Sequence, residues 1–311
     1  MEYARAMWET FKNPTTKRDK MDSLLHLYID GAFDRRSLLK RLTKVAGSAA
    51  AAAVFFENSG WAQAVPSACP DGVRVPEDAP DIVAEDIQFA GKAGNIFAHL
   101  AKPRELKEAL PAIINIHENR GLVPHHKDMT RRFARAGFIG LGIDLLSRQG
   151  GTHAFTDAQQ AQAYGRTTEP ERLEDMLSAI EYLKSEGFVR PERIGVTGFC
   201  AGGGNVFLLA FNSKDLAAAA PFYGTPPLPI PNMNDVCPLC VFMADVDPGT
   251  NGNIPGMLTA INGARKSAEM HMWAGARHAF MNDTGAAYNA TATCASWDIL
   301  LAFFRRELFR A

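Results

Sequence analysis

The sequence carries no surplus of charge of either sign. Its 33 Lys and Arg against 34 Asp and Glu leave a net charge of −1 at pH 7, so the chain lacks the basic field that attracts nucleic acid. We also find no internal repeat and no nucleic-acid motif. We therefore expect no nucleic-acid partner. A chain of 311 residues with 47% apolar content predicts one large domain or two small ones.

Residues 45–56 are uncharged and mostly apolar, but twelve residues are too few to cross a bilayer, which needs about 20. The run suits the central part of a signal peptide. Before it, Arg35 and Arg36 lie in a segment that resembles the twin-arginine export signal, and after it Ala62-Gln63-Ala64 forms a cleavage pattern. We therefore predict a leader over residues 1–64, membrane contact only through that leader, and a periplasmic protein. The alternative is an ordered amphipathic helix pair and a cytoplasmic protein.

Cysteine is scarce, with five residues at positions 69, 200, 237, 240 and 294. In an oxidising compartment some of those other than Cys200 can pair, and Cys237 and Cys240 are close enough in sequence to do so. No second cysteine pair follows them at zinc spacing, and no βαβ context supports a redox motif. The sequence therefore predicts no bound metal, and nothing in it requires an organic cofactor.

A folded domain is expected over residues 81–311. Residues 65–80 before it are rich in Pro, Ala, Asp and Gly, which indicates a linker or an irregular N-terminal arm. Apolar periodicity predicts helices at 127–136, 173–186 and 297–308, and strands at 82–89, 95–102, 112–116, 138–143, 194–196, 217–223, 239–244 and 270–274. Strands alternating with helices predict an α/β fold whose mostly parallel central sheet has helices on both faces.

Residues 194–206 have the form of a nucleophile elbow, in which a short strand turns sharply into a helix. Cys200 occupies the turn, between Gly198 and Gly202, which must be small so that strand and helix can approach. The first N–H groups of the helix favour a thiolate at this position. The alternative is that Cys200 is a small buried apolar residue.

Three further polar residues follow strand ends, where the chemistry of a parallel sheet collects: Glu118, Asp247 and His278. The chain order Cys200, Asp247, His278 is the order of nucleophile, acid and base in α/β-hydrolases. His278 lies in a glycine-led loop and suits a base, which Asp247 would orient. Asp245 is a rival acid, and we prefer Asp247 because a Pro-Gly pair follows it directly.

The end of the strand over residues 112–116 suggests the rest of the site. Glu118 is a candidate second base, and the N–H groups of Asn119 and Ala201 would form a two-donor oxyanion hole. His125 and His126 lie at a helix start without a carboxylate at ligand spacing, so we interpret them as solvated rather than as metal ligands.

From residue 82 to residue 308 the chain resembles the dienelactone hydrolase family, the carboxymethylenebutenolidases of α/β-hydrolase fold. The resemblance rests on the His117-Glu118 strand end, the segments 144–149, 198–203 and 275–280, and Asp247. It implies a hydrolase of lactones or small esters that works through a thioester on Cys200. It also implies that His278 is the base, that Asp247 orients it, and that Glu118 helps to form the thiolate when substrate binds.

The resemblance also implies a site for a substrate carboxylate made of two arginines. Arg148 matches the first, whereas Asn282, followed by Asp283, stands where the second would be. We therefore expect a small-molecule substrate, with a weakened preference for one that bears a carboxylate. The alternative function is a catalytically idle periplasmic binding module on the same fold.

Overall fold

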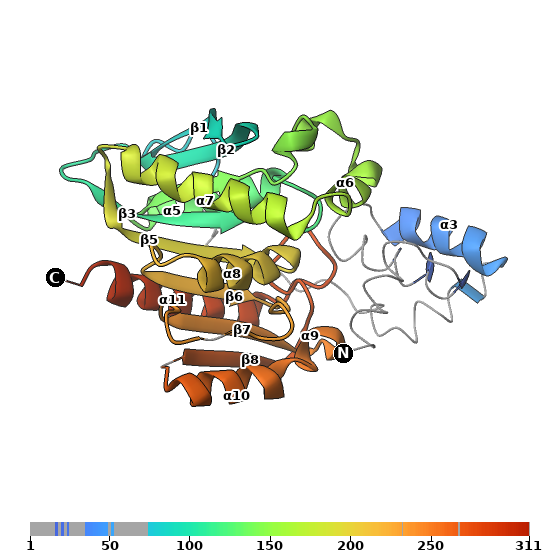
Figure 1. The fold of residues 1–311 in the computed structure, drawn as a ribbon. Helices are drawn as coiled ribbons and strands as arrows, with labels where there is room; N and C mark the ends of the chain where they lie inside the picture. Colours follow the sequence, from blue (N-terminus) through green and yellow to red (C-terminus); the bar gives the residue numbers. More distant parts are fainter. Residues whose placement is uncertain are drawn as a thin grey trace.

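The computed structural model describes residues 16–17, 20–21, 24, 35–48, 51–52, 74–231, 233–266 and 268–310. An eight-stranded sheet with helices on both faces forms the body (Figure 1). Its strands are β1 (Ile82–Gly91), β2 (Gly94–Pro103), β3 (Leu110–Ile116), β4 (Ile139–Ile143), β5 (Val189–Phe199), β6 (Ala218–Phe222), β7 (Leu239–Val246) and β8 (Ala268–Arg277). Its helices are α5 (Pro124–Arg135), α6 (Asp157–Tyr164), α7 (Glu169–Ser185), α8 (Ala201–Asn212), α9 (Pro248–Asn251), α10 (Ile254–Ala264) and α11 (Ala290–Leu308).

The strand order is β1-β2-β4-β3-β5-β6-β7-β8, and β2 runs antiparallel to both of its neighbours. All pairs from β4 to β8 are parallel. Strands β4 and β6 are buried along their whole length and are apolar throughout, as expected for parallel strands covered on both faces. The predicted α/β-hydrolase fold, with a mostly parallel central sheet between helices, is confirmed.

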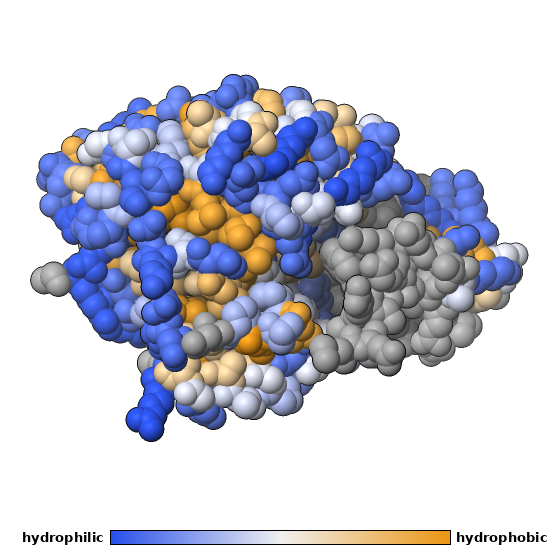
Figure 2. Space-filling model, in the orientation of Figure 1, coloured by the Kyte–Doolittle hydropathy of each residue, from blue (hydrophilic) through white to orange (hydrophobic). Residues whose placement is uncertain are grey.

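Two apolar cores lie on opposite faces of the sheet. One joins α7, α8 and α10 to the sheet, and the other joins α5 and α11 to it. Figure 2 shows the first face, where hydrophobic surface near α7 and α8 is surrounded by hydrophilic residues. Both layers are needed because an internal parallel strand presents apolar side chains in both directions.

Several helices begin earlier than apolar periodicity predicts, because local signals set their starts. Pro124 opens α5, three residues before the predicted start. Thr168 caps α7 through a reciprocal capping box with Glu171. Asn289 caps α11 by accepting a hydrogen bond from the Ala292 N–H. Helices α6 and α10 were not predicted, because their apolar residues do not form a continuous stripe.

The described part of the predicted leader contains helix α3 (Arg35–Ala46). Its Leu38 and Leu42 are fully buried and pack with Met21 and Ala52. An amphipathic helix is what the alternative to a signal peptide expects, but the cleavage pattern at residues 62–64 lies outside the described residues. Export and cleavage therefore stay predictions. No described helix is long and apolar enough to span a membrane.

The described end of the predicted linker, residues 74–80, is an irregular arm that packs on the body. Val75 is buried, its N–H donates to Asp128 Oδ1 at 2.7 Å, and its carbonyl accepts from Arg131 Nε at 2.7 Å. These contacts hold the arm against α5 and position Arg74 beside the loop that follows β8.

Candidate active site

Cys200 lies on the sharp turn between β5 and α8. Its backbone angles, φ 56° and ψ −117°, are unusual for a residue other than glycine. Such strain costs on the order of 1–3 kcal/mol and persists only where neighbours hold it in place. Here the Cys200 N–H donates to the Phe222 carbonyl at 3.1 Å, and the Cys200 carbonyl accepts from the Gly204 N–H at 3.2 Å. The turn thus has the geometry of a nucleophile elbow.

The glycines around Cys200 allow strand and helix to approach closely. A Cβ on Gly198 would lie 2.6 Å from the Gly202 carbonyl oxygen, and one on Gly202 would collide with the carbonyl oxygens of Ile116 and His117. The predicted need for small residues at 198 and 202 is therefore confirmed. The same contacts place the first turn of α8 beside the end of β3, where Glu118 follows.

His278 directly follows β8 and hydrogen-bonds the carboxylate that follows β7. The Nδ1 atom of His278 lies 2.6 Å from Oδ2 of Asp247, and both side chains are nearly buried. Asp247 also accepts from the Thr250 N–H at 3.4 Å as the N-cap of α9. Asp245 instead accepts from the Gly275 N–H at 3.3 Å. Of the two candidate acids, the structure places Asp247 on the imidazole.

The electrostatics of this cluster favour a protonated His278. Burial by itself lowers the pKa of the imidazole, but the charges of Cys200 and Asp247 and hydrogen bonds to both side chains raise the pKa well above its usual value. Burial opposes ionisation of Asp247, yet the charge of His278 keeps the pKa of that carboxyl below its usual value. These contacts favour the imidazolium form of His278, which lies between Cys200 and the Asp247 carboxylate.

We expect Asp247→Asn to lower kcat/KM by on the order of 10²- to 10⁴-fold, because the amide no longer stabilises the imidazolium or fixes its tautomer. Asp245→Asn is the matched control, since it changes a carboxylate two residues away that bonds only backbone. Initial rates on one activated ester measure both. A larger loss in Asp245→Asn would assign the orienting role to that residue.

Glu118 is buried at the end of β3 with few partners. Its side chain is 2% exposed, and Oε2 accepts one hydrogen bond, from Asn282 Nδ2 at 3.0 Å. In the described structure Oε1 has no hydrogen-bond partner. Burial lowers the pKa of nearby His126 to about 4, so this ring is neutral at pH 7, and its Nε2 accepts from the Glu118 N–H at 3.1 Å. The carboxylate thus retains capacity to accept a proton.

The interpretation of His125 and His126 as solvated residues is wrong. They are 5% and 0% exposed, respectively. His125 Nδ1 lies 3.2 Å from Oδ1 of Asp283, and the other carboxylate oxygen of Asp283, Oδ2, accepts from Arg74 and Arg132. The loop after β8 therefore covers the start of α5, a long-range contact that spacing within one helix does not reveal.

The segments that carry the predicted oxyanion donors lie side by side. Asn119 follows Glu118 and is buried, and Ala201 is the first residue of α8. The first N–H groups of a helix have no intrahelical acceptor and remain available to other partners. Close packing of Gly202 against the end of β3 brings the two segments together.

Three residues near Cys200 were missed by sequence reasoning. Asn205 on α8 donates to the Tyr164 hydroxyl at 2.8 Å and accepts from Arg172 Nε at 3.0 Å, and the Arg172 guanidinium lies over the Tyr164 ring. Burial raises the pKa of Tyr164, and the charge of Cys200 adds to that rise. The one signal in the sequence is Asn205 itself, the single polar residue among the first eleven residues of α8.

The structure places Arg148 in an ion-pair network rather than beside Cys200. Its guanidinium bonds Asp175 through Nε at 3.1 Å and Nη2 at 2.8 Å, and Glu174 through Nη2 at 2.6 Å. It lines a cavity of about 280 Å³ that Cys200, Asp247 and His278 do not line. This differs from the expected guanidinium open to substrate, and its binding role stays a prediction.

The Arg148 guanidinium already donates hydrogen bonds to carboxylates on α7. We therefore expect Arg148→Ala to change KM about equally for a carboxylate-bearing and a neutral ester. It should also lower the free energy of unfolding by about 1–3 kcal/mol, since it leaves the buried Asp175 without its partner. Asp175→Asn separates the two roles, because it frees the guanidinium. If Asp175→Asn lowers KM only for the carboxylate-bearing ester, Arg148 binds the substrate carboxylate.

Two of the cysteines outside the elbow are free thiols and one is bonded. Cys237 and Cys240 do not pair, and Cys294 is disulfide-bonded. Burial raises the pKa of both Cys237 and Cys240 to about 12. Neither thiol has the lowered pKa of a redox-active cysteine, so the CxxC segment lacks the properties of an exchange site.

The fold and the Cys200–His278–Asp247 cluster define an α/β-hydrolase. The chain belongs to the dienelactone hydrolase family, whose sequence profile matches residues 96–308. The predicted family is thereby confirmed, and with it the assignment of the chain to hydrolases of ester or lactone bonds.

Individual relatives agree with this assignment. A protein named "Putative carboxymethylenebutenolidase" from Saccharolobus solfataricus is 28% identical over 259 residues, which cover 71% of this chain and 98% of that protein. A Bradyrhizobium protein named "Probable 2-oxo-3-(5-oxofuran-2-ylidene)propanoate lactonase" is 29% identical over 244 residues, 74% of this chain and 97% of its own. The crystal structure titled "Putative Dienelactone Hydrolase" from Klebsiella pneumoniae superposes with a TM-score of 0.66 at 25% identity, covering 72% of this chain and 99% of that one.

Proposed function

We propose that this protein is a cysteine-dependent hydrolase of lactones or small esters that forms a thioester on Cys200. The observation that carries the proposal is the strained elbow position of Cys200 together with its hydrogen bond to His278, which Asp247 holds at 2.6 Å. A thiol that is only a buried apolar residue has no need of a strained backbone or of an oriented imidazolium.

The reaction follows from these positions. The Cys200 thiolate attacks the substrate carbonyl carbon, and the N–H groups of Asn119 and Ala201 stabilise the oxyanion that forms. The imidazolium of His278 then protonates the departing alkoxide as the C–O bond breaks, which leaves a thioester. Water attacks the thioester carbonyl carbon while neutral His278 takes its proton, and the C–S bond then breaks to release the Cys200 thiolate and restore the starting pair. The products are a carboxylic acid and an alcohol, which form one molecule when the substrate is a lactone.

We assign Glu118 to the formation of the thiolate. Its carboxylate is buried beside the elbow, and its support is one neutral amide, from Asn282, rather than a cation. Burial opposes ionisation of Glu118, but its contacts with His126 and Asn282 keep the pKa of this carboxyl below its usual value, so it is a carboxylate before substrate binds. Glu118 thus serves as a second acceptor for the thiol proton when bound substrate displaces water from the site.

We further propose that the substrate is a small lactone or ester with at most a weak requirement for a carboxylate. The name of the Bradyrhizobium relative describes an unsaturated lactone that bears a carboxylate. In this chain Asn282 donates to Glu118, and Arg148 is paired with Asp175 and Glu174. Asn282 is uncharged and the Arg148 guanidinium is already paired, so neither position offers a free cation to a substrate carboxylate.

Turnover of p-nitrophenyl acetate combined with mass spectrometry of the quenched enzyme tests the proposal. We expect an acetyl adduct on the peptide that contains Cys200, and release of nitrophenol faster than release of acetate. A screen of lactones and short esters then identifies the preferred ring or chain. An unreactive Cys200 without turnover of any ester would support the binding module instead.

A further inference from the structure

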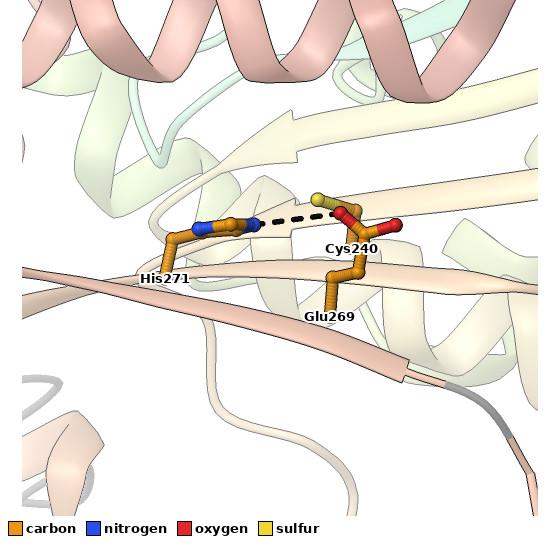
Figure 3. A group of neighbouring side chains, drawn as sticks. All are labelled: Cys240, Glu269 and His271. Atoms are coloured by element: carbon orange, nitrogen blue, oxygen red, sulfur yellow. Dashed lines mark ion pairs between the residues drawn. The ribbon is translucent and has the colours of Figure 1, made fainter. Parts of the chain in front are cut away.

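A second cluster of chemically active side chains lies at the amino ends of β7 and β8. It consists of Cys240, Glu269 and His271 (Figure 3). Cys240 is opposite Glu269 in the parallel pairing of β7 and β8, and His271 lies two residues further along β8 on the same face as Glu269. The carboxyl ends of these strands lead to Asp247 and His278. The cluster therefore lies at the opposite end of the strands from the candidate active site.

We propose that Cys240, Glu269 and His271 bind a divalent transition-metal ion of the zinc type. Thiolate, imidazole and carboxylate are the three ligand types that zinc takes in proteins. One ligand atom from each residue lies within 4.8 Å of the other two, and His271 Nε2 is 3.6 Å from Glu269 Oε2. Ligands of a tetrahedral ion with bonds of about 2.0–2.3 Å lie roughly 3.3–3.8 Å apart, so small side-chain rotations complete the site.

His271 is already positioned as a ligand. Its Nε2 is buried and has no hydrogen-bond partner in the described structure, and Figure 3 shows this edge of the ring directed toward Glu269. A buried nitrogen without a partner is costly, and a bound cation would satisfy it. The ring stacks on Phe242, with centroids 5.4 Å apart and planes 26° apart, which restrains its orientation.

Neighbouring side chains orient Glu269 and leave an entry route from solvent. Arg306 on α11 donates to Oε1 of Glu269 and to Glu307, which leaves Oε2 of Glu269 for the ion. Cys240 is fully buried, whereas the side chains of Glu269 and His271 are 36% and 28% exposed on the edge strand β8. An ion can therefore enter from solvent, displace the thiol proton to water, and keep a water molecule as its fourth ligand.

This site joins β8, the edge strand, to β7 and does not touch the elbow, so it does not depend on the proposed function. The sequence predicted no metal because no second cysteine pair follows Cys237 and Cys240 at zinc spacing. The ligands found here include only one of that pair, and the other two come from the neighbouring strand, which spacing along the chain does not reveal.

Titration of the full-length Cys200→Ala protein with Co²⁺ tests the proposal, because this background removes the partly exposed thiol of the elbow as a competing cobalt ligand. We expect one Co²⁺ per chain with a thiolate-to-cobalt charge-transfer band that Zn²⁺ abolishes by competition. The band should disappear in Cys240→Ala and persist in Cys237→Ala, the matched control. His271→Gln should weaken binding by at least about tenfold.

His271→Gln also keeps the test decisive if Cys240→Ala fails to fold, since residue 271 is partly exposed. Circular dichroism checks the fold of each variant. Absence of a stoichiometric band in the Cys200→Ala protein would overturn the proposal, as would a band that survives both Cys240→Ala and His271→Gln. If a ligand variant made in the protein that retains Cys200 loses the metal and keeps full esterase activity, that result leaves the proposed function intact.

Discussion

Replacing Cys200 by alanine is expected to remove nearly all ester turnover, a loss of at least about 10⁴-fold in kcat. The reason is that covalent catalysis requires the sulfur atom itself, and neither the oxyanion donors nor His278 can form the acyl intermediate. Steady-state rates on p-nitrophenyl acetate measure the loss. Because alanine keeps a Cβ at the same strained position, the free energy of unfolding should change little.

Cys237→Ala is the matched control for this variant, since it removes another free thiol that is partly buried. It should retain wild-type rates and wild-type labelling of Cys200. Retention of more than about a tenth of the activity by Cys200→Ala would reject the nucleophile assignment, because a lost nucleophile costs orders of magnitude.

His278→Ala should lower kcat/KM by a comparable amount, and the Cys200→Ala/His278→Ala double variant should be no worse than either single variant. A nucleophile and its base act as one unit, so their losses do not add. In the wild-type enzyme the rate should fall as pH rises through the raised pKa of His278, because neutral imidazole cannot protonate the leaving alkoxide. This alkaline decline should be absent from the residual activity of His278→Ala.

His153→Ala is a suitable control, because this histidine lies in a short helical segment and contacts the Phe97 ring. It should leave both the rate and the pH profile unchanged. Additive losses in the double variant, or an alkaline decline that survives in His278→Ala, would show that a different group activates the thiol.

Much of the candidate site could be predicted from sequence because its members occupy positions with strong local signals. The glycines at 198 and 202 mark the elbow around Cys200, and the structure shows the collisions that larger residues would cause. His278 and Asp247 each follow a buried strand, and the carboxyl ends of parallel strands meet at one edge. The local pattern and the expected sheet topology together therefore predict that these residues lie at one site.

Predictions about how side chains pair across the fold were less successful. Asp245 and Asp247 differ by two residues and both follow β7, so only the structure assigns the imidazole to Asp247. His125 and His126 are covered by a loop more than 150 residues further along the chain, as the contact to Asp283 shows. Arg148 likewise pairs with α7, and an exposed arginine cannot be distinguished from a paired one by its neighbours in sequence.

The sequence by itself determined the order of the strands, the helices α5, α7, α8 and α11, the elbow and the family, since these depend on apolar periodicity, turn residues and motif spacing along the chain. The tertiary structure decided which carboxylate orients His278, where the Arg148 guanidinium is held, and that Cys240 lies beside Glu269 and His271. The physical reason is that hydrogen bonds, ion pairs and metal coordination act over a few ångströms in space. Strand pairing and helix packing bring distant residues within that range, and one sequence without its fold does not record those distances.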